Sequence, residues 1–66
     1  MKAYVVQVRK GTYLTDKFRT TTNLQQCMWL KDRTTAELYA TDKDRDGRVV
    51  EVYIRKEQGQ WVAYKE

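Results

Sequence analysis

The chain has 66 residues, a net charge of +4, and 41% hydrophobic and 12% aromatic residues. A chain of this length forms one domain, residues 1–66, and such domains bury only ~60% of the surface that the unfolded chain exposes. Small domains are often stabilised by disulfides, a metal or a partner, and the single cysteine, Cys27, excludes an internal disulfide. A metal and a homo-oligomer therefore stay open as sources of stability.

The N-terminal residues and the distribution of charge bear on location and partners. The apolar run at residues 3–6 is too short for a signal sequence or a membrane span, and one free cysteine suits a reducing compartment. We expect a cytoplasmic protein with no membrane partner. Residues 1–31 hold six Lys or Arg and one Asp, a net charge of +5 that would attract an anionic partner. An ordinary solvated surface explains the same charge, and we favour that interpretation.

Alternating residues predict two strands near the N-terminus. Residues 3–9 carry valine or tyrosine at every second position, the pattern of a half-buried strand. Gly11 follows as the natural turn, because glycine accepts the positive φ that hairpin turns need. Residues 12–15 then return as a second strand, and residues 16–23 show no periodicity and are predicted to be a loop.

Two capping boxes mark predicted helix starts. Thr22 and Gln25 predict a single helical turn that ends near Cys27, and Thr34 and Glu37 predict the start of a longer helix. The apolar face of the longer helix and its expected glycine stop are Ala36, Tyr39, Ala40 and Gly47.

The C-terminal part predicts a second hairpin. Residues 50–54 alternate between apolar and other side chains, residues 57–60 are turn-like, and residues 61–64 form the partner strand. The sequence therefore predicts a single small α+β domain. Its mostly antiparallel sheet, with the elements strand-strand-helix-strand-strand along the chain, packs on one helix.

Three segments carry a resemblance that covers most of the chain. They are YVVQV with KGTYLT near the start, TTNLQQCMWLKDRTTAELYA in the middle, and GRVVEVYI near the end. In these apolar positions and one glycine, the chain resembles short uncharacterised phage and prophage accessory proteins of low-GC Gram-positive bacteria. The resemblance implies a small accessory protein in the cytoplasm of the bacterial host that binds a host or phage protein, and it implies no site residues.

Three aspartates alternate in the segment DKDRDG. Asp42, Asp44 and Asp46 precede a glycine, as at the start of a calcium loop of the form D-x-D-x-D-G. An EF-hand needs a bidentate glutamate at position twelve, where this chain has Tyr53, and Glu51 at position ten is a poor substitute. A solvated polar turn also explains the aspartates, and we favour that interpretation. We expect no cofactor, with a weak calcium site of about 10⁻⁴–10⁻³ M as a third functional alternative.

A second cluster combines basic and aromatic residues in the first half of the chain. Aromatic platforms flanked by cations hold single-stranded nucleic acid, and threonine hydroxyls contact phosphates. In a small domain, the same aromatic residues more often belong to the core. Nucleic-acid binding is therefore the first alternative function, and its candidate residues are Lys10, Tyr13, Lys17, Phe18 and Arg19.

Catalysis is the least supported function. The chain has no histidine and no serine, which excludes Ser/His and Cys/His dyads. One cysteine without histidine cannot build a structural zinc site, and we interpret Cys27 as a buried hydrophobe. We therefore predict that the protein is not an enzyme.

Large aromatic side chains support a protein-interaction module. A small sheet has edge strands that can accept an added strand, and aromatic residues often anchor interfaces. Burial in the core explains any one of the rings equally well. Protein binding is the favoured function, and its candidate interface residues are Trp29, Tyr53, Trp61 and Tyr64.

Overall fold

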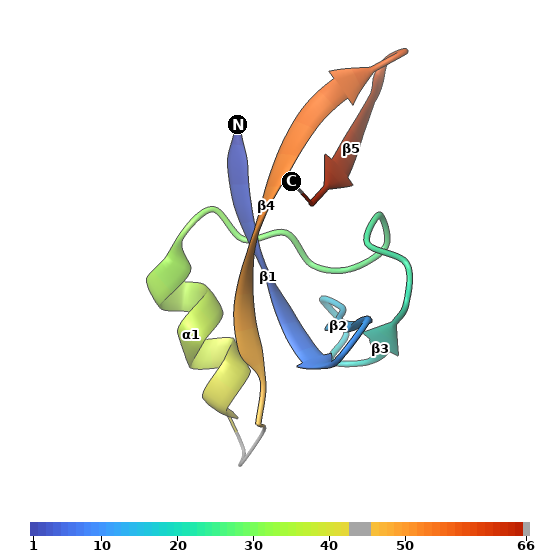
Figure 1. Cartoon of the computed structure of the whole chain (residues 1–66). Coiled ribbons are helices and arrows are strands. Elements are labelled where there is room, and N and C mark those ends of the chain that lie inside the picture. The colour runs from blue at the N-terminus through green and yellow to red at the C-terminus, as the bar shows by residue number, and fades with distance from the viewer. Residues whose placement is uncertain (43–45, 66) are drawn as a thin grey trace.

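The computed structural model describes residues 1–42 and 46–65. Within these ranges the chain forms an antiparallel five-stranded sheet, in the order β3-β2-β1-β4-β5, and one helix (Figure 1). The predicted α+β class, with a mostly antiparallel sheet packed on one helix, is confirmed. No helix in the described ranges is long and apolar enough to cross a membrane. The elements are β1 Lys2–Arg9, β2 Thr12–Leu14, β3 Thr20–Thr21, α1 Arg33–Thr41, β4 Arg48–Glu57 and β5 Gln60–Tyr64.

The pair β1 and β4 forms the centre of the sheet and is buried on both faces. Val5 faces Val50 across the pair, and Val6 faces Val49. Because neighbouring residues of a strand point to opposite faces, the complete burial of both Val5 and Val6 requires a cover on each side. The predicted half-buried strand is therefore wrong for the middle of β1, where both faces contact the core.

Different parts of the chain cover the two faces. On one face, Leu24, Cys27 and Trp29 pack in a first cluster with Val5 and Val52. Helix α1 packs Ala36 and Ala40 against a second cluster on the other face. The chain passes from one face to the other at Leu30, whose backbone N–H and C=O each bond to Tyr4 of β1 at 2.8 Å.

The N-cap of helix α1 lies two residues before the predicted one. Asp32 is the N-cap, and its carboxylate accepts hydrogen bonds from the Thr34 N–H at 3.3 Å and the Thr35 hydroxyl at 3.0 Å. The predicted capping box of Thr34 and Glu37 does not form, because Glu37 instead pairs with Arg33 at 3.4 Å. An aspartate accepts the orphan amides of a first turn at least as well as a threonine.

Gly47 also differs from its predicted role. The helix ends at Thr41, and Gly47 does not have a positive φ, so it is not a left-handed helix stop. Its N–H donates to the carbonyl of Ala40 at 3.0 Å. A Cβ at this position would lie 3.0 Å from that carbonyl and 3.1 Å from Val6 Cγ1. Glycine is needed here because the backbone passes close to the helix.

The segment between β2 and α1 contains more structure than the sequence predicted. Two residues of the predicted loop, Thr20–Thr21, form the short strand β3 beside β2. The predicted turn near Cys27 is present, but Asn23 rather than Thr22 caps it. The Asn23 side-chain oxygen accepts from the Gln25 N–H at 2.9 Å, and its backbone carbonyl accepts from the Gln26 N–H at 3.0 Å.

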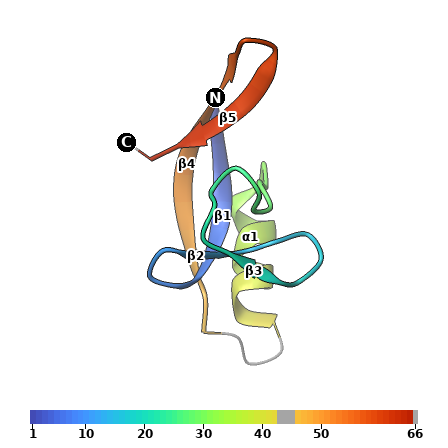
Figure 2. The same cartoon turned by 90° about the vertical axis from the view of Figure 1, so that its right-hand side faces the viewer.

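The molecule is elongated, with principal extents of 39 × 21 × 21 Å. The length comes from the hairpin of β4 and β5, whose far end projects beyond the body in both views (Figures 1 and 2). The opposite end holds the β1–β2 turn and the end of α1. Residues 56–61, at the far end of the hairpin, are exposed.

Candidate functional site

One face of the projecting hairpin carries a group of three side chains, which we term the aromatic stack: Tyr53, Arg55 and Tyr64. Tyr53 and Tyr64 are partners in the strand register, and their rings stack with centroids 5.9 Å apart and an interplanar angle of 27°. The Arg55 guanidinium lies 4.9 Å from the centre of the Tyr64 ring. Such ring pairs contribute about 0.5–1.5 kcal/mol in addition to the energy of burying their apolar area. The aromatic stack is therefore a well-ordered surface with both apolar and polar groups.

The opposite face of the same hairpin carries Trp61. Its side chain is 48% exposed, and its register partner in β4 is Lys56. Because register partners share a face and neighbours alternate, Trp61 lies on the side away from the aromatic stack. Tryptophan is among the residues that most often anchor protein interfaces.

Trp29, the fourth predicted interface residue, is partly buried and lies against the core, away from the hairpin. It packs against the first cluster, and its indole N–H donates to the Leu24 carbonyl at 3.0 Å. The structure therefore gathers three of the four predicted aromatic residues on one hairpin and separates Trp29 from them. The sequence offered one signal for this separation, because Trp29 stands in the apolar run CMWL, which predicts a contribution to the core, whereas the other three rings lie in predicted strands.

Gln25 makes a contact that the sequence did not predict. Its carboxamide N–H donates to the Ala63 carbonyl at 2.6 Å, and its carboxamide oxygen accepts from the Ala63 N–H at 2.7 Å. Both bonds lie on the outer edge of β5, which has β4 as its one neighbouring strand among the described residues. A single side chain thus supplies the donor and the acceptor that another strand would supply.

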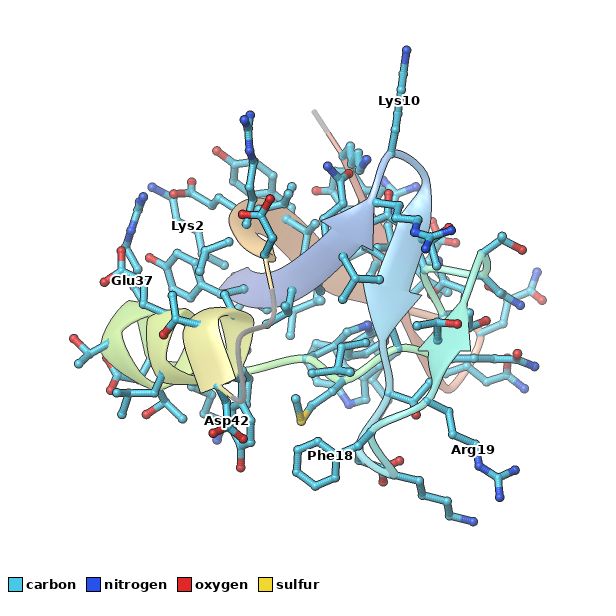
Figure 3. All side chains as sticks on the ribbon, turned by 90° about the horizontal axis from the view of Figure 1, so that it is seen from below. Lys2, Lys10, Phe18, Arg19, Glu37 and Asp42 are labelled. Carbon is cyan, nitrogen blue, oxygen red and sulfur yellow. The ribbon has the colours of Figure 1, made fainter. Side chains whose placement is uncertain are left out.

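The predicted basic and aromatic cluster is divided by the structure. Tyr13 is only 5% exposed and its ring is covered by the Lys65 ammonium group, 5.0 Å from the ring centre. Its ring is therefore not available as a stacking platform. Lys10 extends from the β1–β2 turn in one direction, whereas Phe18 and Arg19 extend in the other (Figure 3).

The remaining three residues of that cluster occupy one tight turn, residues 15–19. The Thr15 hydroxyl accepts hydrogen bonds from the N–H groups of Lys17 at 3.3 Å and Arg19 at 3.1 Å. Phe18 has a φ of 59°, a conformation that non-glycine residues seldom adopt. Its ring is 56% exposed and lies 5.9 Å from the Tyr39 ring of α1. Strained, exposed aromatic residues occur more often at functional sites than elsewhere.

A shallow hollow lies beside this turn, on the first three strands. Hydroxyl groups and one guanidinium line it, a combination that suits an anion such as phosphate. Sequence reasoning singled out the adjacent threonines but not the arginine. The lining residues are Val8, Arg9, Thr12, Thr20, Thr21 and Thr22.

The predicted calcium loop is only partly within the described residues. Asp42 and Asp46 are described, whereas Asp44 lies outside the described residues. The two residues at the later loop positions are occupied in the sheet. Glu51 pairs with Lys2 at 3.4 Å, and Tyr53 belongs to the aromatic stack. In the described ranges, no group of three or more acidic or cysteine side chains is placed to hold a metal ion.

Cys27 is 8% exposed and lies in the first core cluster. Its thiol donates to the Leu24 carbonyl at 3.1 Å. Burial raises the pKa of this thiol, because the charged thiolate would lose its hydration. These features fit the prediction of a small buried hydrophobe.

The fold defines a small α+β domain with a curled antiparallel sheet and one helix. No family model matches the chain, and neither curated proteins nor solved structures give a match. The surfaces described above are therefore the basis for a functional proposal.

Proposed function

We propose that this chain is a small, non-enzymatic accessory protein of the phage type, which binds a host or phage protein in the bacterial cytoplasm. The main support for this proposal is the projecting hairpin, which presents half-exposed Trp61 on one face and the aromatic stack on the other. Aromatic residues and arginine are the side chains that most often dominate binding energy in protein interfaces. The resemblance to phage accessory proteins supports the cellular setting of this proposal.

The chemistry of the described residues supports binding rather than catalysis. Cys27 is buried and hydrogen-bonded, with a raised pKa, so it is a poor nucleophile. The ion pairs lie on the open surface. An example is Arg55 with Glu57, at 2.6 Å. Their arrangement stabilises side-chain positions and offers no enclosed site for a reacting group.

Affinity capture from a lysate of a low-GC Gram-positive bacterium tests this proposal. The wild-type chain should retain a protein, and Trp61→Ala or Tyr64→Ala should weaken its binding about 30-fold or more, the loss expected for an interface anchor. Leu38→Ala is the matched control, because Leu38 is 67% exposed but lies on α1. Retention of nucleic acid alone, or equal retention by all variants, would count against the proposal.

Single-stranded nucleic acid is a second candidate ligand. The specific observation in its favour is the turn that holds Phe18 exposed between Lys17 and Arg19, next to the hollow with Arg9. A bound base would stack on Phe18, and the cations would neutralise phosphates. Binding of an oligothymidylate should then fall steeply between 50 and 200 mM salt, on the order of tenfold or more. Salt-independent binding, or none, would remove this candidate.

A further inference from the structure

A β-bulge in β1 decides which way the Arg9 side chain points. Gln7 pairs with Tyr13 in the register of β1 and β2, and the next register pair joins Arg9 to Thr12. Strand β1 therefore contains one residue, Val8, more than β2 over this interval. Bulges turn side chains away from the regular alternation of a strand, and they occur often next to functional sites. The direction of Arg9 is therefore informative.

The bulge places Arg9 on the face of the sheet that carries α1. Register partners share a face, and so do alternate residues of one strand. Arg9, Thr12 and Leu14 therefore lie on the same side, and Leu14 belongs to the second core cluster, which includes residues of α1. Thr20 is the partner of Leu14 in β3 and lies on this side as well. Without the bulge, Arg9 would follow Gln7 to the opposite face.

The polar side chains that line the hollow on these three strands lack partners among the described residues. Arg9 takes part in none of the ion pairs there, and none of the residues that line the hollow is acidic. Within the described ranges, the hydroxyls of Thr12, Thr20 and Thr22 make no hydrogen bond. One guanidinium and three hydroxyls in the hollow are therefore available to a ligand.

The charges around Arg9 favour an anionic ligand. A neighbouring hollow is lined by Arg9 together with Lys10, Arg48 and one acidic residue, Asp46. Asp46 makes no ion pair with Arg9 in the part of the chain that the structure describes. Three cations beside one carboxylate leave a positive potential at this end of the sheet, which attracts anions.

We propose that the hollow lined by Arg9, Thr12, Thr20 and Thr22 is a binding site for a phosphate group. The planar guanidinium donates a parallel pair of N–H bonds to phosphate oxygens, and threonine hydroxyls donate to further oxygens. Because these oxygens are arranged tetrahedrally, they can contact a guanidinium on β1 and hydroxyls on β2 and β3 at once. The oxygens of a carboxylate lie in one plane and reach fewer of these donors. The inference goes beyond protein binding, since the projecting hairpin does not include this surface.

The experiment titrates the full chain with inorganic phosphate at constant ionic strength and follows the amide and guanidinium signals by NMR. We expect a dissociation constant of about 1–10 mM, as one charge-assisted pair and a few hydroxyl bonds give on an open surface. The shifts should be confined to the hollow. Acetate should bind at least about threefold more weakly, because it leaves some of the donors without an acceptor.

Dimethyl phosphate distinguishes two sources of the same ligand chemistry. If it binds as tightly as inorganic phosphate, the site accepts a phosphodiester such as the backbone of a nucleic acid. If only inorganic phosphate binds, the site takes a free or terminal phosphate. Both results support the proposal, and neither depends on the protein partner proposed above.

Substitutions separate the guanidinium from its charge. Arg9→Gln should weaken phosphate binding at least about tenfold, because the bidentate pair is lost. Arg9→Lys should weaken it about threefold or more, since an ammonium group keeps the charge but lacks the planar fork. Thr20→Val removes one hydroxyl at nearly constant shape and should weaken binding about twofold or more. Lys56→Gln is the matched control, because Lys56 is exposed on the distant hairpin and carries the same charge as Arg9. It should leave the dissociation constant unchanged.

The substituted side chains of Arg9, Thr20 and Lys56 are all exposed, so each variant should fold, and its amide spectrum provides the check. The proposal is overturned if Arg9→Gln keeps the wild-type affinity or if Lys56→Gln loses as much affinity as Arg9→Gln. Acetate binding as tight as that of phosphate, or shifts spread over the whole surface, would overturn it too. A failed lysate capture would leave this result unaffected, and a failed phosphate titration would leave the protein-binding proposal in place.

Discussion

The backbone of Gly47 lies directly against Ala40 in the last turns of α1, with the Gly47 N–H bonded to the Ala40 carbonyl at 3.0 Å. A methyl group at Gly47 would approach the same carbonyl to 3.0 Å and the fully buried Val6 side chain to 3.1 Å. This contact joins the helix to the start of β4, the strand that leads into the projecting hairpin. It is therefore a point where one added carbon should disturb both layers.

Gly47→Ala should destabilise the protein by about 1–3 kcal/mol, the usual cost of overpacking. The measurement is urea denaturation followed by tryptophan fluorescence. Gly59→Asn is the matched control, because Gly59 has a φ of +81° with open space around it, and asparagine tolerates the left-handed region. The control should change stability by only a few tenths of a kcal/mol. An equal cost at both positions would contradict the close-packing explanation for Gly47.

The N-terminus of α1 gives a second prediction. Asp32→Ala should cost about 0.5–2 kcal/mol, because the Thr34 N–H loses its acceptor and the Thr35 hydroxyl loses its partner. Thr34→Ala should change the free energy of unfolding by no more than ~0.5 kcal/mol, as expected for a surface substitution. Thermal unfolding followed by circular dichroism measures both. A larger loss of stability for Thr34→Ala than for Asp32→Ala would instead support the capping box that the sequence predicts.

The regular elements could be predicted because they depend on local patterns. Alternation defined the strands near residues 3–9 and 50–54, and the helix between them followed from Ala36 and Ala40. The choice between caps could not be made, because Asp32 and Thr34 are both good N-cap residues and only the packing of the helix selects one. The apolar run at residues 3–6 is consistent with a strand covered on both faces, but the alternation that continues to residue 9 favoured a half-buried strand.

The candidate site depends on contacts between residues far apart in sequence. Tyr13 and Tyr64 look alike as strand residues, yet one is buried and the other stacks on Tyr53 at the surface. Gln25 contacts Ala63, 38 residues away. Such a contact exists only after the sheet curls, so no pattern in the sequence could have indicated it.

Cys27 gives a prediction about reactivity. In the folded chain, iodoacetamide should modify it at least about tenfold more slowly than a free cysteine at pH 8.5, because burial limits access and lowers the thiolate fraction. Mass spectrometry after timed quenching gives the rate, and the urea-unfolded chain is the control. Because the pKa of the thiol is raised in the folded chain, the stability of the fold should also depend on pH. The contribution of the neutral thiol to stability is fully present below the ordinary thiol pKa and declines as pH rises through the window between the ordinary and the raised pKa. Native reactivity equal to that of the unfolded chain would contradict the buried environment.

The aspartate-rich segment gives the last prediction. Calcium should bind there no more tightly than about 10⁻³ M, because Glu51 is paired with Lys2 and Tyr53 is stacked on Tyr64, so neither completes the ligand set. The amide NMR signals of Asp42, Asp46 and Gly47 should stay in place at about 50 μM calcium, far below that dissociation constant. Glu51→Gln, which removes the one nearby carboxylate of β4, should leave that result unchanged. Saturable shifts at micromolar calcium would contradict this prediction, because the segment would then have calcium ligands that the sheet does not supply.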